Sequence, residues 1–385
     1  MPSICFVAGD PSGDAHAACL IAAIKDKLPS LVCTGLGGSA MQQAGMLLLD
    51  DLTQTASIGP FDAARHLGRF IRARRLLEDH LRTHRPDLVV LVDFGDFNLP
   101  VIAPLVHRQG IPILYYISPQ IWAWGRWRLR LIRRYVRRML VFFAFEEQFY
   151  KQQGIPVTWV GHPLVESSSV SVSVSLNKEQ TLQQLGLNPW RTTVGLLPGS
   201  RLSEINRHLP LMLRAATQLT RHMPGVQFLV PKAPTVNRVE LEKHLRQIKK
   251  LAVSISEIPI ANALQLMQAA IVASGTATLE VAWHSVPMVV VYCTSWPTYL
   301  AARLAVRVPH IAMVNLVAGR ALVPELLQHQ AHPKRIARAL ISLLRDETQR
   351  KTQQEAFQQV RDKLGASGSV ARAASVVLDM LLPAS

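Results

Sequence analysis

The sequence predicts an α/β protein made of two Rossmann-like halves, each a parallel sheet covered by helices. Short apolar stretches alternate with longer amphipathic ones along the chain, which is typical of repeated β–α units. The run Leu88–Val92 is continuously apolar, as expected of a strand that is buried on both faces of a parallel sheet. A length of 385 residues favours two domains of about 150–200 residues over a single one.

The first half contains the clearer β–α series. Its first strand leads through a turn at residues 9–14 into an amphipathic helix at 15–28. We expect strands in this half at residues 4–8, 31–35, 87–97, 111–117 and 139–143, and one more strand with its turn at 158–163. This succession is consistent with a doubly wound sheet.

The β–α pattern starts again after residues 167–175, where Ser and Val alternate as in a low-complexity linker with no evident function. Strands are then expected at residues 193–197, 226–230, 252–256, 270–274 and 288–292, and helices at 334–381 with a break at 365–368. We therefore predict one Rossmann-like domain at 1–170, a second at 180–345, and C-terminal helices at 346–385 that pack back on the first domain.

The net charge narrows the possible partners. Lys and Arg number 42 against 26 Asp and Glu, which gives a formal charge of +16 and a pI near 10.2. This balance favours nucleic acid, an anionic membrane surface or phosphorylated small molecules. The four cysteines form no CxxC pair, which indicates a reduced, cytosolic chain. Neither a signal pattern nor an apolar run of about 18 residues stands out, so we expect membrane contact to be peripheral at most.

A turn near the middle of the chain carries the main functional prediction. Pro198, Gly199 and Ser200 break an apolar strand, and a helix is expected to begin just after them. Free backbone N–H groups and the helix dipole at such a turn attract anions, and Arg201 adds a planar set of donors that suits phosphate oxygens. The alternative is an ordinary β–α turn with a solvated arginine.

The second half contains another turn of the same kind, at Ser274, Gly275 and Thr276. Its hydroxyl and amide groups are available to phosphate or ribose oxygens. Glu280 stands one helical turn later, where it could accept from ribose hydroxyls or merely complement the helix dipole. Asn315 and Gln328 lie in a following polar loop and helix start, and they are weaker candidates for the same ligand.

Asp93 follows the clearest strand of the first half, and ligands of open α/β sheets bind beyond the carboxyl ends of strands. Its carboxylate could act as a general base, or it could cap the next helix. The aromatic stretch at 118–124 suits sugar faces or acyl chains, and it could equally be core. The glycines at 35–38 lack the rest of a dinucleotide fingerprint, and the Asp-Phe-Gly triplet lacks the other kinase motifs.

A basic amphipathic helix is predicted at residues 57–84. Phe61, Leu67, Phe70 and Ile71 share one face, and arginines fill most of the rest. A helix of this kind can pack on a sheet as a surface helix or lie on anionic lipid. The arginine-dense run at 126–138 has the same character.

Phosphate-type turns in one half and a carboxylate at a strand end in the other suggest a donor site and an acceptor site facing each other across a cleft, which is the GT-B glycosyltransferase plan. In order and spacing, the motifs resemble those of the lipid-A-disaccharide synthase family along nearly the whole chain. The matching segments are AGDPSGD at 8–14, DFGDFN at 93–98, YISPQIWAW at 116–124, VGHP at 160–163, LLPGSR at 196–201, SGTATLE at 274–280 and NLVAGR at 315–320.

The resemblance implies a peripheral enzyme on the cytoplasmic face of the inner membrane of a Gram-negative bacterium. It implies transfer of 2,3-diacylglucosamine from its UDP conjugate to 2,3-diacylglucosamine 1-phosphate (lipid X), giving a β-1,6-linked disaccharide 1-phosphate and UDP. The domain at 1–170 would hold the acceptor and face the membrane, and the domain at 180–345 would hold the UDP-sugar. A homodimer is compatible with this reading.

The reaction needs a base for the acceptor hydroxyl and charge neutralisation for the departing UDP. We assign the base to Asp93, with Asp96 as the second choice. The donor would be held by Gly199, Ser200, Arg201, Ser274, Gly275, Thr276, Glu280, Asn315 and Gln328. The acceptor would be held by Asp10, Ser12, Gln120 and Trp122, of which Asp10 and Gln120 depart from the residues usual in the family.

No DxD motif is present and the histidines show no ligand spacing, so we expect a reaction without a metal or other cofactor. Two other readings stay open. A nucleic-acid-binding module would fit the charge, but no recognised nucleic-acid motif supports it. Another GT-B UDP-sugar transferase or a UDP-sugar epimerase with a soluble substrate would fit the turns.

Overall fold

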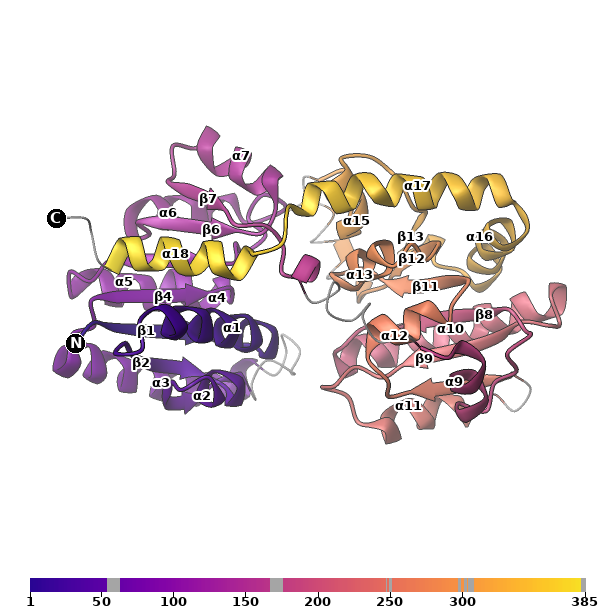
Figure 1. Cartoon of the computed structure of the whole chain (residues 1–385), viewed down its shortest axis with the longest axis horizontal. Coiled ribbons are helices and arrows are strands. Elements are labelled where there is room, and N and C mark those ends of the chain that lie inside the picture. Colours follow the sequence, from indigo (N-terminus) through magenta and orange to yellow (C-terminus); the bar gives the residue numbers. More distant parts are fainter. Residues whose placement is uncertain are drawn as a thin grey trace. The chain divides into compact units, whose positions relative to one another are not determined.

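The computed structural model describes residues 1–53, 63–166, 176–246, 248, 251–296, 299–300, 303 and 308–381. It divides into two compact units (Figure 1). Unit 1 comprises Met1–Pro163 together with Leu364–Ser385, and unit 2 comprises Leu164–Lys363. The predicted linker at 167–175 lies outside the described residues.

The described part of unit 1 is built on a seven-stranded parallel sheet in the order β3-β2-β1-β4-β5-β6-β7. The strands are β1 (Ser3–Ala8), β2 (Val32–Gly37), β3 (Leu47–Asp51), β4 (Leu88–Val92), β5 (Ile113–Tyr116), β6 (Arg138–Val141) and β7 (Val157–Trp159). The helices are α1 (Pro11–Lys27), α2 (Ser39–Gln43), α3 (Ala63–His84), α4 (Gly95–Phe97), η2 (Asn98–Ile102), α5 (Ala103–Arg108), η3 (Arg126–Arg128), α6 (Leu129–Tyr135), α7 (Ala144–Gln152) and α18 (Ser369–Leu381).

The described residues of unit 2 repeat this plan with a six-stranded parallel sheet in the order β10-β9-β8-β11-β12-β13. Its strands are β8 (Thr193–Leu197), β9 (Gln227–Pro231), β10 (Val253–Ser256), β11 (Ala269–Ala273), β12 (Met288–Tyr292) and β13 (Glu325–Leu327). The helices are α9 (Lys178–Gln184), α10 (Leu202–His222), α11 (Arg238–Leu245), α12 (Ile260–Gln265), α13 (Ala277–Trp283), α15 (Met313–Ala318), η4 (Gln328–Gln330), α16 (Pro333–Arg345) and α17 (Glu347–Leu364).

The central strands are apolar because helices cover both faces of each sheet. Every residue of β4 and of β11 is buried. In unit 2, the longest helix, α10, buries Leu209, Met212 and Ala216 on one face against the core that β8 and β11 share. Because these cores hold the strands and helices rigidly, the turns that follow the strands have fixed positions, and so do the side chains on them.

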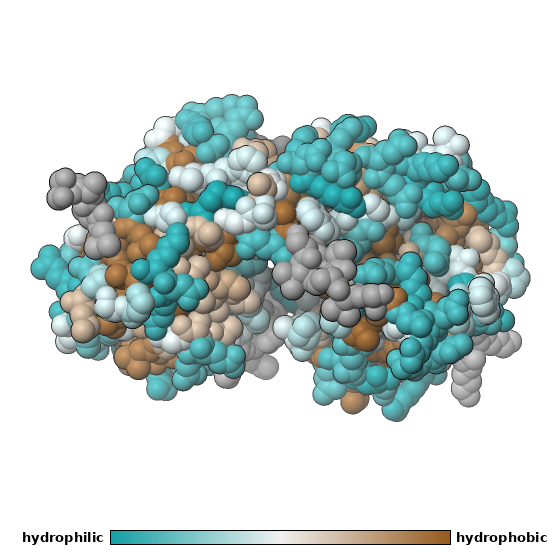
Figure 2. Space-filling view, viewed as in Figure 1, coloured by the Kyte–Doolittle hydropathy of each residue, from teal (hydrophilic) through white to brown (hydrophobic). Residues whose placement is uncertain are grey.

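The predicted C-terminal segment at 346–385 does not belong to unit 1 as a whole, because the chain re-enters unit 1 only at Leu364. Helix α17 belongs to unit 2 up to Lys363, because the Gln353 side chain bonds both the N–H and the C=O of Met288, where β12 begins. On the face shown in Figure 2, α17 presents mainly hydrophilic side chains. Helix α18 alone packs on unit 1, where it lies against α1 and buries Ala373, Ala374 and Val377.

Residues 347–381 together meet the length and hydropathy expected of a membrane-spanning helix. In the structure, this stretch is two helices separated at Gly365–Gly368, whose two glycines have φ of 91° and 89°. Glycine adopts this left-handed backbone readily. Helix α18, with 13 residues, is shorter than the roughly 20 residues that cross a bilayer core.

Strand order reverses once in each sheet. In unit 1 the chain runs from β1 outward through β2 to β3, and then returns to place β4 on the other side of β1. In unit 2, β8 leads through β9 to β10, and β11 then pairs with the free side of β8. Ligands of open α/β sheets bind beyond the carboxyl ends of the two strands at such a reversal.

Candidate functional site

The reversal in unit 2 brings two predicted turns side by side. The turn at 198–201 follows β8, the turn at 274–276 follows β11, and these two strands are hydrogen-bonded neighbours. Both turns lead into helices, α10 and α13. The two stretches that the sequence singled out as anion-binding therefore occupy the usual ligand position of this sheet.

The turn after β8 is held by a carboxylate of the protein itself. Gly199 has a φ of 116°, a conformation that other residues rarely adopt. The Ser200 and Arg201 N–H groups donate to Glu204 Oε2 over 3.0 and 3.3 Å. Arg201 Nη1 lies 3.6 Å from Glu204 Oε1, and the arginine side chain is 60% exposed. In the structure, the group held by these donors is the Glu204 carboxylate, and the binding of a diphosphate by this turn stays a prediction.

A buried histidine, His208 of α10, is hydrogen-bonded to the same turn. His208 Nδ1 lies 3.1 Å from the Pro198 carbonyl, and Nε2 accepts from the Cys293 N–H over 3.2 Å. This pairing requires the neutral ring with its proton on Nδ1. Burial lowers the pKa of His208, which stabilises that form. The residue thus ties the turn after β8 to the end of β12. The available signal for this role was the position of His208 on the apolar face of a predicted helix, and His208 was not among the predicted site residues.

The turn after β11 is open. Gly275 has a φ of 154°, and a side chain placed there would meet nothing within 4 Å. Ser274 Oγ donates to the Ile311 carbonyl over 3.0 Å, whereas the Thr276 side chain is exposed. Glu280 lies half-buried one turn into α13, where burial raises its pKa. Among the side chains singled out at this turn, that of Thr276 is therefore exposed, whereas Ser274 and Glu280 are partly buried.

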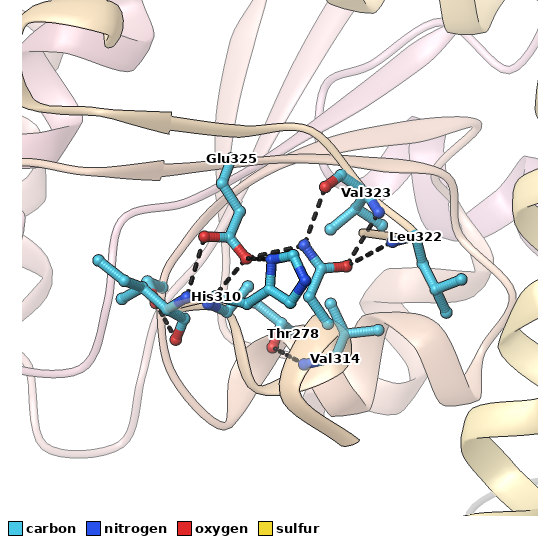
Figure 3. A network of polar contacts seen from close by, with 10 residues as sticks. Thr278, His310, Val314, Leu322, Val323 and Glu325 are labelled. Atoms are coloured by element: carbon cyan, nitrogen blue, oxygen red, sulfur yellow. Dashed lines mark hydrogen bonds and ion pairs between the residues drawn. The ribbon is translucent and has the colours of Figure 1, made fainter. Parts of the chain in front are cut away.

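The loop above this turn is held by the polar network in Figure 3. Glu325 accepts from the Ile311 and Ala312 N–H groups over 2.9 and 3.2 Å. Asn315 donates to Glu325 over 2.7 Å and to the Val323 carbonyl over 3.0 Å. The amide oxygen of Asn315 accepts from two further backbone N–H groups, those of Leu322 and Val323.

Asn315 is fully buried, and these bonds use the hydrogen-bonding capacity of its side chain. The expectation that Asn315 contacts a ligand directly is corrected by this geometry, which gives the residue a positioning role. Gln328 is similarly engaged, because its side chain bonds both the N–H and the C=O of Thr294 over 3.0 and 2.9 Å.

In unit 1, the reversal of strand order brings the turns after β1 and β4 together. A side chain on Gly9 would overlap the ring of Phe94, so glycine permits this close approach. Asp10 caps α1 by accepting from the Gly13 N–H over 2.6 Å, while Ser12 is exposed. The predicted acceptor residues of the first turn thus adjoin the predicted catalytic aspartates.

Asp93 occupies a strained position. Asp93 and Phe94 have φ values of 43° and 49°, and two consecutive non-glycine residues in this region cost about 1–3 kcal/mol each. The Tyr115 hydroxyl and the Asn98 amide both donate to the Asp93 carbonyl, the latter over 2.9 Å. Such strain persists only when neighbours fix it, and it gathers at functional sites.

Asp96 lies three residues further on, and its side chain is 73% exposed. It pairs with Arg128, whose side chain is only 5% exposed and whose guanidinium stacks over Trp124, 4.3 Å from the ring centroid. A buried arginine needs a charged partner because of the cost of desolvation. Arg128 therefore fixes where the Asp96 carboxylate lies.

The aromatic stretch after β5 divides into buried and exposed parts. Gln120 is exposed, whereas Trp122 is buried and donates through Nε1 to Glu146 Oε1 over 3.0 Å. Glu146, at the start of α7, also accepts from the Phe143 N–H over 3.3 Å. Burial raises the pKa of Glu146 to about 7, although the bonds from Trp122 and Phe143 oppose this shift.

Replacing Glu146 by Gln is expected to change how stability depends on pH. In the folded protein the Glu146 pKa of about 7 lies above its ordinary value of 4.5, so unfolding releases a proton between these values. The free energy of unfolding therefore falls as pH rises through this window, by about 3 kcal/mol. Denaturation of the parent and E146Q at pH 5 and pH 8 should show a flatter response in the variant.

Glu78, a partly exposed residue of α3 that pairs with Arg82, supplies the control substitution Glu78→Gln. If E146Q lost as much stability as the parent between pH 5 and pH 8, the pH dependence would not come from a buried, protonated Glu146 carboxyl.

The predicted membrane helix has two environments. Phe70 packs inward against Phe97 and Phe94, with ring centroids 5.1 and 6.0 Å away, so it does not join an exposed apolar face. Leu67 and Ile71 are 58% and 42% exposed. Phe61 lies outside the described residues.

Across the residues that the structure describes, no group of three or more His, Cys, Asp or Glu side chains could hold a metal ion.

Known proteins resemble this chain along nearly its whole length. A family model described as Lipid-A-disaccharide synthetase matches residues 4–378. Lipid-A-disaccharide synthase of Syntrophus aciditrophicus (strain SB) is 40% identical over 378 residues, covering 98% of this chain and 97% of that protein. The synthase of Geobacter metallireducens is 38% identical, also covering 98% and 97%.

Solved structures share the fold at low identity. CalG4, the calicheamicin glycosyltransferase, matches with a TM-score of 0.61 and 17% identity, covering 100% of this chain and 99% of that one. S. aureus MnaA in its UDP co-structure matches with a TM-score of 0.67 and 12% identity, covering 99% and 97%. The predicted α/β architecture of the GT-B type, which UDP-GlcNAc epimerases also resemble, is confirmed.

The extent of the family match decides identity, since similar folds alone serve transferases and epimerases. The chain therefore belongs to the lipid-A-disaccharide synthase family and is a glycosyltransferase of lipid A biosynthesis.

Proposed function

We propose that the protein transfers 2,3-diacylglucosamine from UDP to the 6-hydroxyl of 2,3-diacylglucosamine 1-phosphate. The observation that best supports this assignment is the pairing, at the strand reversal of unit 2, of two turns suited to phosphate. Purified protein incubated with both substrates should form the β-1,6 disaccharide 1-phosphate and UDP. Hydrolysis of the donor without disaccharide would count against the assignment.

Unit 2 is proposed to hold the donor. Arg201 and the amides of Gly199 and Ser200 would bind the diphosphate, with help from the turn at 274–276. Glu280, whose carboxyl lies one turn into α13, would accept from ribose hydroxyls. Gln328 would contribute through the position it gives the loop at Thr294.

Unit 1 is proposed to hold the acceptor and the base. Transfer with inversion forms a bond from the acceptor oxygen to the anomeric carbon while the bond from that carbon to the UDP oxygen breaks. The proton leaves the hydroxyl for Asp93, or for Asp96 as the second choice, and UDP departs with the electron pair. Asp10, Ser12, Gln120 and Trp122 would contact the acceptor, Trp122 from the position set by Glu146.

A UDP-sugar transferase or epimerase that uses a soluble substrate is the alternative, because several structures of the same fold are UDP-GlcNAc 2-epimerases. Dependence on acyl chains separates the two. Turnover that falls sharply with deacylated substrates supports the proposal, whereas equal turnover supports the alternative.

We also propose that unit 1 associates with the cytoplasmic face of the inner membrane of a Gram-negative bacterium. Exposed Leu67 and Ile71 share α3 with arginines, as in helices that lie on anionic lipid. Nucleic acid has no proposed role. A homodimer stays a prediction, which light scattering would check.

The double substitution of Leu67 and Ile71 by Ser is expected to reduce co-sedimentation with anionic phosphatidylglycerol vesicles several-fold, because apolar burial adds to electrostatic attraction. Leu47→Ser is the matched control, since Leu47 is 64% exposed and lies outside α3. Equal vesicle binding by the parent and the double variant would refute the role of α3.

A further inference from the structure

The Glu204 carboxylate lies inside the turn proposed to bind diphosphate. Its Oε2 atom accepts from the Ser200 N–H over 3.0 Å and from the Arg201 N–H over 3.3 Å. Its Oε1 atom lies 3.6 Å from Arg201 Nη1. Two amides and a guanidinium thus converge on the Glu204 carboxylate. Two of these donors, the Ser200 amide and the Arg201 guanidinium, are also proposed to bind phosphoryl oxygens.

One of these bonds belongs to a capping box: Arg201 is the N-cap of α10, and Glu204 at position N3 accepts from its backbone N–H. Glu204 also accepts, over a shorter distance, from the N–H of Ser200, one residue before the cap, which a capping box does not include. A side chain on Gly199 would overlap the Glu204 carboxylate, so the glycine makes room for the acid within the turn. The chain thus supplies its own anion at this position.

We propose that Glu204 competes with the diphosphate of the nucleotide for the turn at 199–201 and thereby sets the affinity for UDP. The inference rests on the proposed donor role of this turn. A carboxylate and a diphosphate cannot share the same donors, because like charges a few ångströms apart repel strongly.

Displacement of Glu204 needs only rotation of its own side chain. The side chain is 31% exposed, so a path to solvent exists, and the residue lies in the first turn of α10. Its return to Ser200 and Arg201 would help UDP, the leaving group of the reaction, to depart. Product release limits turnover in many enzymes, so such a competitor has a function beyond holding the helix.

Isothermal titration calorimetry with UDP and with uridine tests this inference. Glu204→Gln removes the charge, and Glu204→Ala removes the competing group. Both variants are expected to bind UDP about 5-fold or more tightly than the parent, because the binding-competent turn is then populated more fully. Affinity for uridine, which lacks the diphosphate, should stay unchanged.

The matched control is Glu240→Gln, because Glu240 also pairs with a basic residue three positions away, Lys243, on α11 of the same unit. UDP binding that is weaker or unchanged in both Glu204 variants would overturn the inference and make Glu204 a support for Arg201. An equal gain for UDP and uridine would also overturn it. A parent protein that does not bind UDP would instead refute the donor role of the turn.

Discussion

Replacing Asp93 by Asn is expected to lower turnover by about 10²–10⁴-fold, the range for loss of a positioned general base. Asn has the same shape but cannot accept the proton of the acceptor hydroxyl. The strained backbone at Asp93, together with the bonds that Tyr115 and Asn98 make to its carbonyl, fixes this residue beyond the end of β4. The measurement is kcat for disaccharide formation with both substrates saturating.

Asp96→Asn is the comparison for Asp93→Asn, because Asp96 lies on the same segment and its charge is already committed to Arg128. We expect a smaller loss of turnover from this change. A larger loss in D96N than in D93N would transfer the role of base to Asp96. Near-normal turnover in D93N would remove Asp93 from the mechanism.

Replacing Arg201 by Ala is expected to lower kcat/KM by about 10²–10³-fold, as when one preorganised donor to developing charge is lost. The guanidinium is the sole charged group among the donors of the turn after β8, and negative charge grows on the diphosphate as the bond to the sugar breaks. UDP affinity should fall together with kcat/KM.

Arg246→Ala provides the control for R201A, because Arg246 is 77% exposed and pairs with Glu242 elsewhere in unit 2. This variant should keep the kinetics of the parent. Parental kcat/KM in R201A would show that the diphosphate is bound by other groups.

The fold was largely predictable from local pattern. Short continuous apolar runs such as Leu88–Val92 and Met288–Tyr292 could be predicted as strands, because a strand of a parallel sheet is buried on both faces and is therefore apolar along its length. Two strands were missed, β3 at Leu47–Asp51 and β13 at Glu325–Leu327. Both are edge strands that carry acidic residues, and no residue of either is fully buried. The leucines at 47–49 form only a short apolar stretch that ends in two aspartates, which is weaker than the continuous run of a central strand.

The positions of the candidate site residues in the fold could be predicted from the sequence, but the contacts of their side chains could not. A residue that follows a strand must lie at the carboxyl edge of the sheet, so Asp93 and Arg201 could be placed from sequence. Contacts such as that between Asp96 and Arg128 join residues 32 positions apart, and no local pattern reports them. Asn315 was predicted to contact a ligand because it is polar. In the structure, its side chain is instead hydrogen-bonded within a buried network.

A crystal structure of the protein with UDP tests the donor assignment most directly. We expect diphosphate oxygens within about 3.2 Å of the Ser200 amide and the Arg201 guanidinium, with the Glu204 carboxylate displaced from both. A diphosphate bound away from the turns after β8 and β11, with Glu204 still on Ser200, would contradict it.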